Sequence, residues 1–155
     1  MKLPHLLRVE EEAERFAPLL AAARAAGVRI GWLDLLAPVE APAELARAAE
    51  AGAVRAVAAT AGCNVALKPR RGPPVLLDLL REHFLGCVLV LVRAGAATMA
   101  APAAGAGARE KLAPPPRLRP AGDGWEVAAV DAAARHLDTG KLLAALRRPH
   151  HPWGT

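Results

Sequence analysis

Three basic side chains, Lys68, Arg70 and Arg71, lie within the segment KPRRGPP of residues 68–74. The apolar periodicity that follows predicts a helix over residues 75–85. A helix N-terminus presents free backbone N–H groups and a positive dipole, so cations placed there favour an anion. The two prolines have no N–H group, which removes donors that a phosphate cradle uses. The segment therefore predicts a site for a phosphate-bearing ligand, and the alternative is a solvated turn.

A carboxylate, Asp34, falls at the carboxyl end of a predicted strand over residues 28–33. Ligands of open α/β sheets gather at that edge, where a carboxylate can hold a hydroxyl group, a metal or a substrate proton. The simpler interpretation, which we favour, is an Asp that caps its own loop. No G-x-G-x-x-G pattern follows this strand, so the usual dinucleotide-binding fold is not supported.

A thiol and an amide, Cys63 and Asn64, lie in the turn after a second predicted strand over residues 53–59. They would reach the same sheet edge as Asp34 if the two strands were parallel. A basic neighbour such as Lys68 favours the thiolate, the nucleophilic form of cysteine. No histidine is spaced to act as its base, so a small turn residue is the more common role for Cys63.

No metal or cofactor site is predicted. His150 and His151 are adjacent, but a metal site needs three or more convergent ligands, and no Cys or carboxylate is near them. They belong to an irregular tail over residues 149–155, in which Trp153 is a candidate for docking on a protein partner.

The elements that must position these residues follow from a unit that occurs three times. An Ala/Leu-rich helical stretch ends at a glycine (Gly27, Gly52 or Gly86), and a β-rich run follows directly. The glycine suits the left-handed conformation that ends many helices. The recurrence predicts an α/β fold: a small, three-layer, mixed and largely parallel sheet with crossover helices. The strands over 28–33, 53–59 and 87–92 are expected to be parallel, with the last one central.

The remaining elements complete this expected sheet. A short strand over 65–67 is expected to return as a hairpin, and residues 117–119 and 125–130 flank a good turn, AGDG. A C-terminal helix should follow this C-terminal hairpin. The expected helices are residues 10–26, 43–51, 75–85 and 141–148, the last one capped by Asp138 or Thr139.

Composition predicts one domain over residues 1–155, with an Ala/Gly/Pro-rich loop or linker over 94–116. The net charge is +5, but residues 1–52 hold six basic and eight acidic residues, and residues 53–155 hold fourteen and seven. A basic second part favours an anionic partner, including nucleic acid, although a solvated surface is the simpler interpretation. The two cysteines have no metal spacing, and the longest apolar run, 84–92, is too short to span a membrane. A cytoplasmic protein with no membrane segment is expected.

Three functions remain open from the sequence. The first is a binding or scaffold module that holds an anionic ligand at the basic loop 68–71. The second is a small enzyme with a pocket around Asp34, Cys63 and Lys68 at the sheet edge. The third is a subunit that packs against protein partners through its tail. A concave pocket joining those three residues would favour the enzyme, and an open basic surface would favour anion binding.

Overall fold

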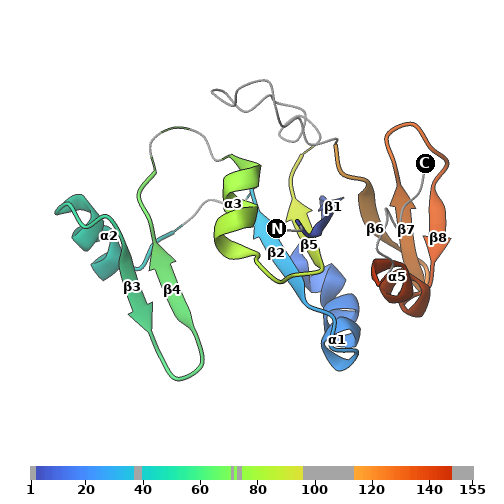
Figure 1. Ribbon diagram of the computed structural model, residues 1–155, viewed down its shortest axis with the longest axis horizontal. Coiled ribbons are helices and arrows are strands. Elements are labelled where there is room, and N and C mark those ends of the chain that lie inside the picture. Colours follow the sequence, from blue (N-terminus) through green and yellow to red (C-terminus); the bar gives the residue numbers. More distant parts are fainter. Residues whose placement is uncertain (1–2, 37–39, 71, 73–74, 96–113, 148–155) are drawn as a thin grey trace. The chain divides into compact units, whose positions relative to one another are not determined.

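The computed structural model describes residues 3–36, 40–70, 72, 75–95 and 114–147 (Figure 1). It groups the chain into two compact units, each described here by itself. The larger unit comprises Met1–Leu36 and Val75–Thr155, and the hairpin unit comprises Ala37–Pro74. The expected single domain over 1–155 stays a prediction. Arg71, most of the predicted linker 94–116 and the tail 149–155 lie outside the described residues.

The larger unit is built on one six-stranded sheet with the order β2-β5-β1-β6-β7-β8. Strands β2, β5, β1 and β6 run parallel to one another, whereas β7 pairs antiparallel with both β6 and β8, so the sheet is mixed and mostly parallel, as predicted. The strands are β1 (His5–Val9), β2 (Ile30–Asp34), β5 (Leu89–Arg93), β6 (Arg117–Ala121), β7 (Gly124–Ala128) and β8 (Arg135–Leu137).

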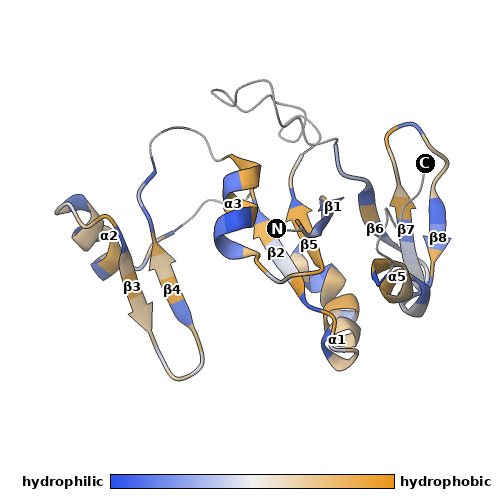
Figure 2. Cartoon of the chain, viewed as in Figure 1, coloured by the Kyte–Doolittle hydropathy of each residue, from blue (hydrophilic) through white to orange (hydrophobic). Residues whose placement is uncertain are grey.

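Strand β5 is the central strand of the parallel part. It pairs with β1 on one side and β2 on the other, over all five of its residues. Leu89, Val90, Leu91 and Val92 are all 0% exposed, which is the burial expected for a strand covered on both faces. Figure 2 shows this strand as a nearly continuous hydrophobic run. The prediction of a central strand over this segment is confirmed.

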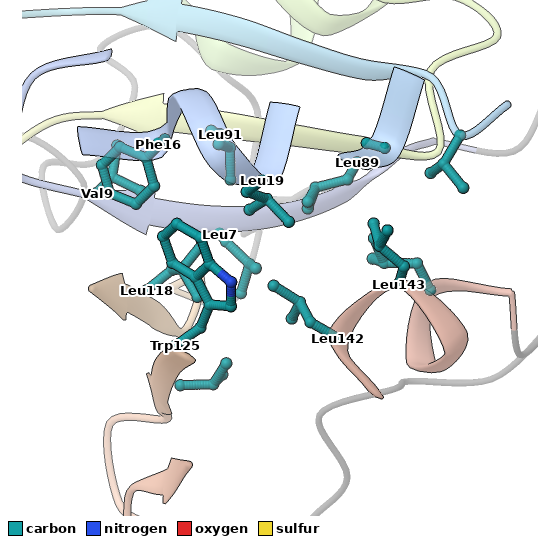
Figure 3. Close-up of a cluster of buried hydrophobic side chains, with 14 residues drawn as sticks. Leu7, Val9, Phe16, Leu19, Leu89, Leu91, Leu118, Trp125, Leu142 and Leu143 are labelled. Carbon is teal, nitrogen blue, oxygen red and sulfur yellow. The ribbon is translucent and has the colours of Figure 1, made fainter. Parts of the chain in front are cut away.

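One face of the sheet is covered by α1 (Ala17–Ala25) and α5 (Thr139–Leu146). The core on this face centres on Phe16, which lies in a short 3-10 helix (Ala13–Phe16) before α1 and is fully buried. Its ring stacks on that of Trp125, with centroids 5.7 Å apart and planes at 19° (Figure 3). The indole N–H of Trp125 donates to Thr139 Oγ1 at 2.8 Å, which satisfies its polar group at the start of α5.

The opposite residues of β5 pack on the other face. Val90 and Val92 form a second core cluster with Leu80, which comes from α3 (Leu76–His83) and is 1% exposed. Because successive strand residues point to opposite faces, one apolar run supplies both clusters. The finer arrangement of three layers with crossover helices stays a prediction.

The predicted helix ends are confirmed at the three recurring glycines. Gly27, Gly52 and Gly86 have φ of 68°, 106° and 80°, the left-handed region that glycine enters without a Cβ penalty. At the other end of a helix, Asp138 caps α5 by accepting the backbone N–H of Lys141 at 2.7 Å. That hydrogen bond lowers the pKa of Asp138, because it favours the charged carboxylate.

The hairpin unit contains α2 (Ala43–Glu50), β3 (Ala56–Ala59) and β4 (Asn64–Leu67). The return strand predicted over 65–67 is confirmed, because β3 and β4 pair antiparallel in a sheet of their own. The prediction that the strand over 53–59 joins the parallel sheet is wrong. Three of the four residues of β3 are alanine and only Ala56 is buried, so this strand lacks the apolar bulk of a central parallel strand.

Two strands were not predicted, and one helix begins later than expected. Strand β1, with the sequence HLLRV, pairs with β5 and β6, and β8 adds three residues at the edge of the sheet. The helix expected over 10–26 is α1, which begins at Ala17, preceded by the 3-10 turn. Pro18 explains this start, because proline is tolerated only in the first turn of a helix.

The close approach of Phe84, the C-cap residue of α3, to Gly31 of β2 generates a stability prediction. A Cβ at Gly31 would lie 2.4 Å from Cδ1 of Phe84, so the Phe84 ring occupies the space of a side chain. Gly31→Ala should lower the free energy of unfolding by about 1–3 kcal/mol, the usual cost of overpacking. Urea denaturation measures this loss.

Two further variants test the cause of that loss. Replacing Phe84 with Leu should shrink the penalty of Gly31→Ala in a double-mutant cycle, because the clashing ring is gone. Gly62→Ala serves as the matched control, since nothing lies within 4 Å of its added Cβ. An equal loss at both glycines would show that the ring contact is not responsible.

Candidate functional site

Three cations gather at the open end of the β3–β4 hairpin. Ala56 of β3 pairs with Leu67 of β4 at the open end of the hairpin. Arg55, just before β3, and Lys68, just after β4, therefore occupy the next positions on the two strands. Arg70 follows two residues later, and all three residues are exposed. We call Arg55, Lys68 and Arg70 the basic cluster. The stretch that leaves β4 is hydrophilic in Figure 2, next to mostly apolar strands.

Arg55 is the member that the sequence prediction missed. The signal was present, because the predicted hairpin pairs the start of one strand with the end of the other and so places residue 55 opposite residue 68. Lys68 and Arg70 are exposed as predicted, and Arg71 lies outside the described residues. The sequence also predicted that the N-terminus of α3 contributes to the anion site. That helix belongs to the larger unit, so the basic cluster does not include it.

The chain segment around the basic cluster is rich in small side chains and has no acidic residue. Residues 51–77 include no Asp or Glu. Val57 and Val65 on the two strands are 55% and 45% exposed, so the hairpin is an open surface. Within unit 37–74, the described acidic residues lie before or on α2, where Glu44 pairs with Arg47. The open end of the hairpin therefore combines exposed basic residues from two chain segments, residue 55 and residues 68–70.

The turn that holds Cys63 lies at the other end of the hairpin. Thr60 Oγ1 accepts the backbone N–H groups of Gly62 at 3.3 Å and Cys63 at 3.2 Å, and the Thr60 N–H donates to Cys63 O at 2.8 Å. Asn64 then begins β4. Cys63 is exposed, but the length of β4 separates it from Lys68 by about 15 Å at the rise of an extended chain. The structure does not bring the thiol and the lysine together.

Asp34 lies at the carboxyl end of β2, as the sequence predicts, and both of its carboxylate oxygens have structural partners. Oδ2 accepts a hydrogen bond from Arg93 Nη1 at 3.0 Å, and Oδ1 accepts the backbone N–H of Leu36 at 2.9 Å. Arg93 is the last residue of β5, so this pair joins two adjacent parallel strands at their ends. Asp34 belongs to the larger unit, and Cys63, Asn64 and Lys68 belong to the hairpin unit.

The Asp34–Arg93 pair is part of a charged rim that the sequence prediction missed. Arg117 at the start of β6 lies 3.4 Å from Glu10, which also pairs with Arg8 of β1. Within the described residues, the Nε atoms of Arg93 and Arg117 are buried without a hydrogen-bond partner. Arginines and carboxylates alternate along the rim, so we assign it to holding the strand ends together. The pairs Asp34–Arg93 and Glu10–Arg117 join segments far apart in sequence, so no local pattern signals the rim.

The part of the chain that the structure describes contains neither a candidate metal site nor a candidate membrane span. No group of three or more His, Cys, Asp or Glu side chains there could hold a metal ion. Among the described helices, none is long and apolar enough to cross a membrane.

The pairing of Asp34 generates a prediction that separates a structural from a catalytic role. Asp34→Ala leaves the partly buried Arg93 guanidinium without this carboxylate, so we expect a loss of about 1–3 kcal/mol in the free energy of unfolding. Asp34→Asn keeps an acceptor for the Leu36 N–H and should lose less. Asp123→Ala, at a fully exposed carboxylate 3.8 Å from His136, is the control and should change stability by less than about 0.5 kcal/mol. Equal stability of all three variants would contradict the structural role.

Comparisons with known proteins were made for the whole chain. No protein-family model matches it, and no curated protein matches it at a significant level. The function proposed below is therefore inferred from the geometry of the described residues.

Proposed function

We propose that this protein is a small α/β binding module whose ligand carries phosphate groups and contacts the basic cluster. One observation carries the proposal: the register of the β3–β4 hairpin, which puts Arg55 and Lys68 at neighbouring positions on one end. Arg70 extends the cluster, and the flanking stretch 51–77 has no acidic residue. Arg71, outside the described residues, would add a fourth cation from the same loop.

The chemistry of the three side chains suits phosphate oxygens. Each guanidinium can donate two parallel hydrogen bonds to one phosphate, and the lysine ammonium adds a mobile point charge. All three residues are exposed, so salt should screen the interaction strongly.

The openness of the hairpin favours an extended chain of phosphates as the ligand. Four of the eight residues of β3 and β4 are alanine, and neither strand has an aromatic side chain that could stack on a base. An oligonucleotide backbone or a polyphosphate would contact several cations at once, and the positive net charge of +5 adds long-range attraction. Nucleotide, polyphosphate and oligonucleotide probes would distinguish these sources of phosphate.

The two other functions have less support. The enzyme needs Asp34, Cys63 and Lys68 around one pocket, but Asp34 is paired with Arg93, and Cys63 lies at the far end of β4 from Lys68. A partner-packing subunit is supported by exposed apolar residues among the described ones, since the tail lies outside the described residues. The most exposed of these are Val54 and Val130, at 86% and 68%. The proposal retains the predicted three-layer arrangement with crossover helices and the expected cytoplasmic location.

The basic cluster generates a prediction about affinity and its salt dependence. The double variant Arg55→Gln/Lys68→Gln should bind a fluorescent single-stranded oligonucleotide more weakly than the wild type. The slope of log affinity against log salt should become shallower by about 1.4, since each phosphate contact on a single strand contributes about 0.7. Fluorescence anisotropy over a range of salt concentrations measures both quantities.

A matched control comes from the same unit. Arg47 on α2 is exposed and pairs with Glu44, so Arg47→Gln removes one charge without touching the cluster and should leave the salt slope unchanged. Unfolding curves should be nearly superimposable for both variants, because the substituted side chains are exposed. Equal losses of affinity in the two variants would show that net charge alone determines binding, and would contradict a specific site at the basic cluster.

A further inference from the structure

A cavity of about 490 Å³ lies at the amino-terminal edge of the parallel sheet in the larger unit. His5 begins β1, Val88 immediately precedes β5, and Val28 lies two residues before β2, so three adjacent strands start near its wall. Leu146 and Arg147 at the end of α5 also line it. Its volume falls in the range of small-molecule sites, about 300–1,000 Å³. The phosphate site proposed above lies in the other unit, so the cavity is a separate feature.

The walls of the cavity are mainly apolar. Their backbone donors are already used, since the N–H of His5 donates to Val88 O at 2.9 Å and that of Val28 to Ala23 O at 2.8 Å. Gly27, at the helix end, contributes no side chain, and a Cβ there would meet nothing within 4 Å. The apolar lining residues are Leu3, Ala26, Val28, Val88 and Leu146. A ligand would therefore bury an apolar body here and find specific polar contacts only at side chains.

The polar side chains of the lining are basic or neutral. They are His5, Cys87 and Arg147, and the described lining contains no Asp or Glu. Arg147 Nη2 donates to Ala26 O at 3.2 Å, which anchors the guanidinium beside the cavity. In the described part of the chain no carboxylate forms an ion pair with Arg147, and a guanidinium has five N–H donors. Most of its donors are therefore available to an anionic group.

We propose that this cavity binds a small molecule with an apolar body and a single carboxylate. The apolar walls would hold the body by burial of apolar surface, and Arg147 at the end of α5 would receive the carboxylate through charge-assisted hydrogen bonds. His5, the first residue of β1, lies on the same lining. The absence of acidic lining residues disfavours an amine of the same shape.

The test uses octanoate and octylamine as a matched pair of probes, both below their micelle concentrations, on the full chain. Octanoate should raise the melting temperature and shift the backbone amide signals of Gly27, Gly86 and Val88 in a ¹H–¹⁵N spectrum. The amide of Gly62, in the hairpin unit, should not move. Octylamine should produce neither effect.

Variants then separate the charge from the fold and from the phosphate site. R147Q should lower the affinity for octanoate about tenfold, the worth of one charge-assisted hydrogen bond, and R147K should retain most of it. The double variant Arg55→Gln/Lys68→Gln should bind octanoate as the wild type does. The cavity proposal and the phosphate proposal can therefore fail independently of each other. Equal binding of octylamine, amide shifts confined to other residues, or undiminished affinity in R147Q would each overturn the proposal. If R147Q does not fold, the probe pair and the wild-type amide shifts decide the question.

Discussion

Burial of β5 from both faces is the constraint on which the larger unit depends. Its four apolar residues are fully buried and divide between the two core clusters, two residues to each. The same strand provides backbone hydrogen bonds to β1 and β2 along its whole length. Helices α1 and α5 on one side and α3 on the other must therefore carry apolar faces, and the stacked pair of Phe16 and Trp125 fills the centre of the first cluster.

The location of charge in the larger unit follows from this burial. The apolar run of β5 ends at Arg93, where the strand leaves the core, and the charged rim begins at that residue. Arg93 is only 20% exposed, so its guanidinium needs a carboxylate nearby, and Asp34 on the adjacent strand supplies it. At the opposite edge, the described residues that line the cavity include no Asp or Glu, which is the basis of the proposal that the cavity takes a carboxylate.

The hairpin unit shows the contrasting case. Its described strands bury little besides Ala56, and a two-stranded hairpin is marginally stable by itself. Such a segment contributes little to a hydrophobic core. Substitution of its exposed cations should therefore change the free energy of unfolding only slightly. The exposed residues of the two strands lie outside any core cluster, unlike those of the parallel sheet in the larger unit.

The sequence predicted the features that depend on local pattern. The apolar run of β5, the glycines at three helix ends, the β6–β7 hairpin and the cap at Asp138 each follow from neighbouring residues. Strand β1 was missed because five residues, HLLRV, show neither alternation nor a turn signal before the acidic run that follows. The role of β3 was predicted wrongly because a helix–glycine–strand unit does not specify its pairing partner.

The basic cluster and the pairing of Asp34 could be predicted from the sequence only in part. The exposed loop from Lys68 follows from its prolines and charges, whereas Arg55 joins it only through the strand register. The partner of Asp34 was beyond a local pattern, since Arg93 lies 59 residues away along the chain. Local chemistry could therefore be predicted from the sequence, and the pairs that tertiary structure creates could not.

The central claim is that phosphate contacts the open end of the β3–β4 hairpin. The most direct measurement is a titration of the ¹⁵N-labelled protein with pyrophosphate at low ionic strength, followed by amide chemical shifts. The account predicts saturable shifts that are largest at Arg55, Lys68, Arg70 and Gly72 and absent from β5. The absence of saturable shifts, or the largest shifts at the charged rim around Arg93 and Arg117, would contradict it.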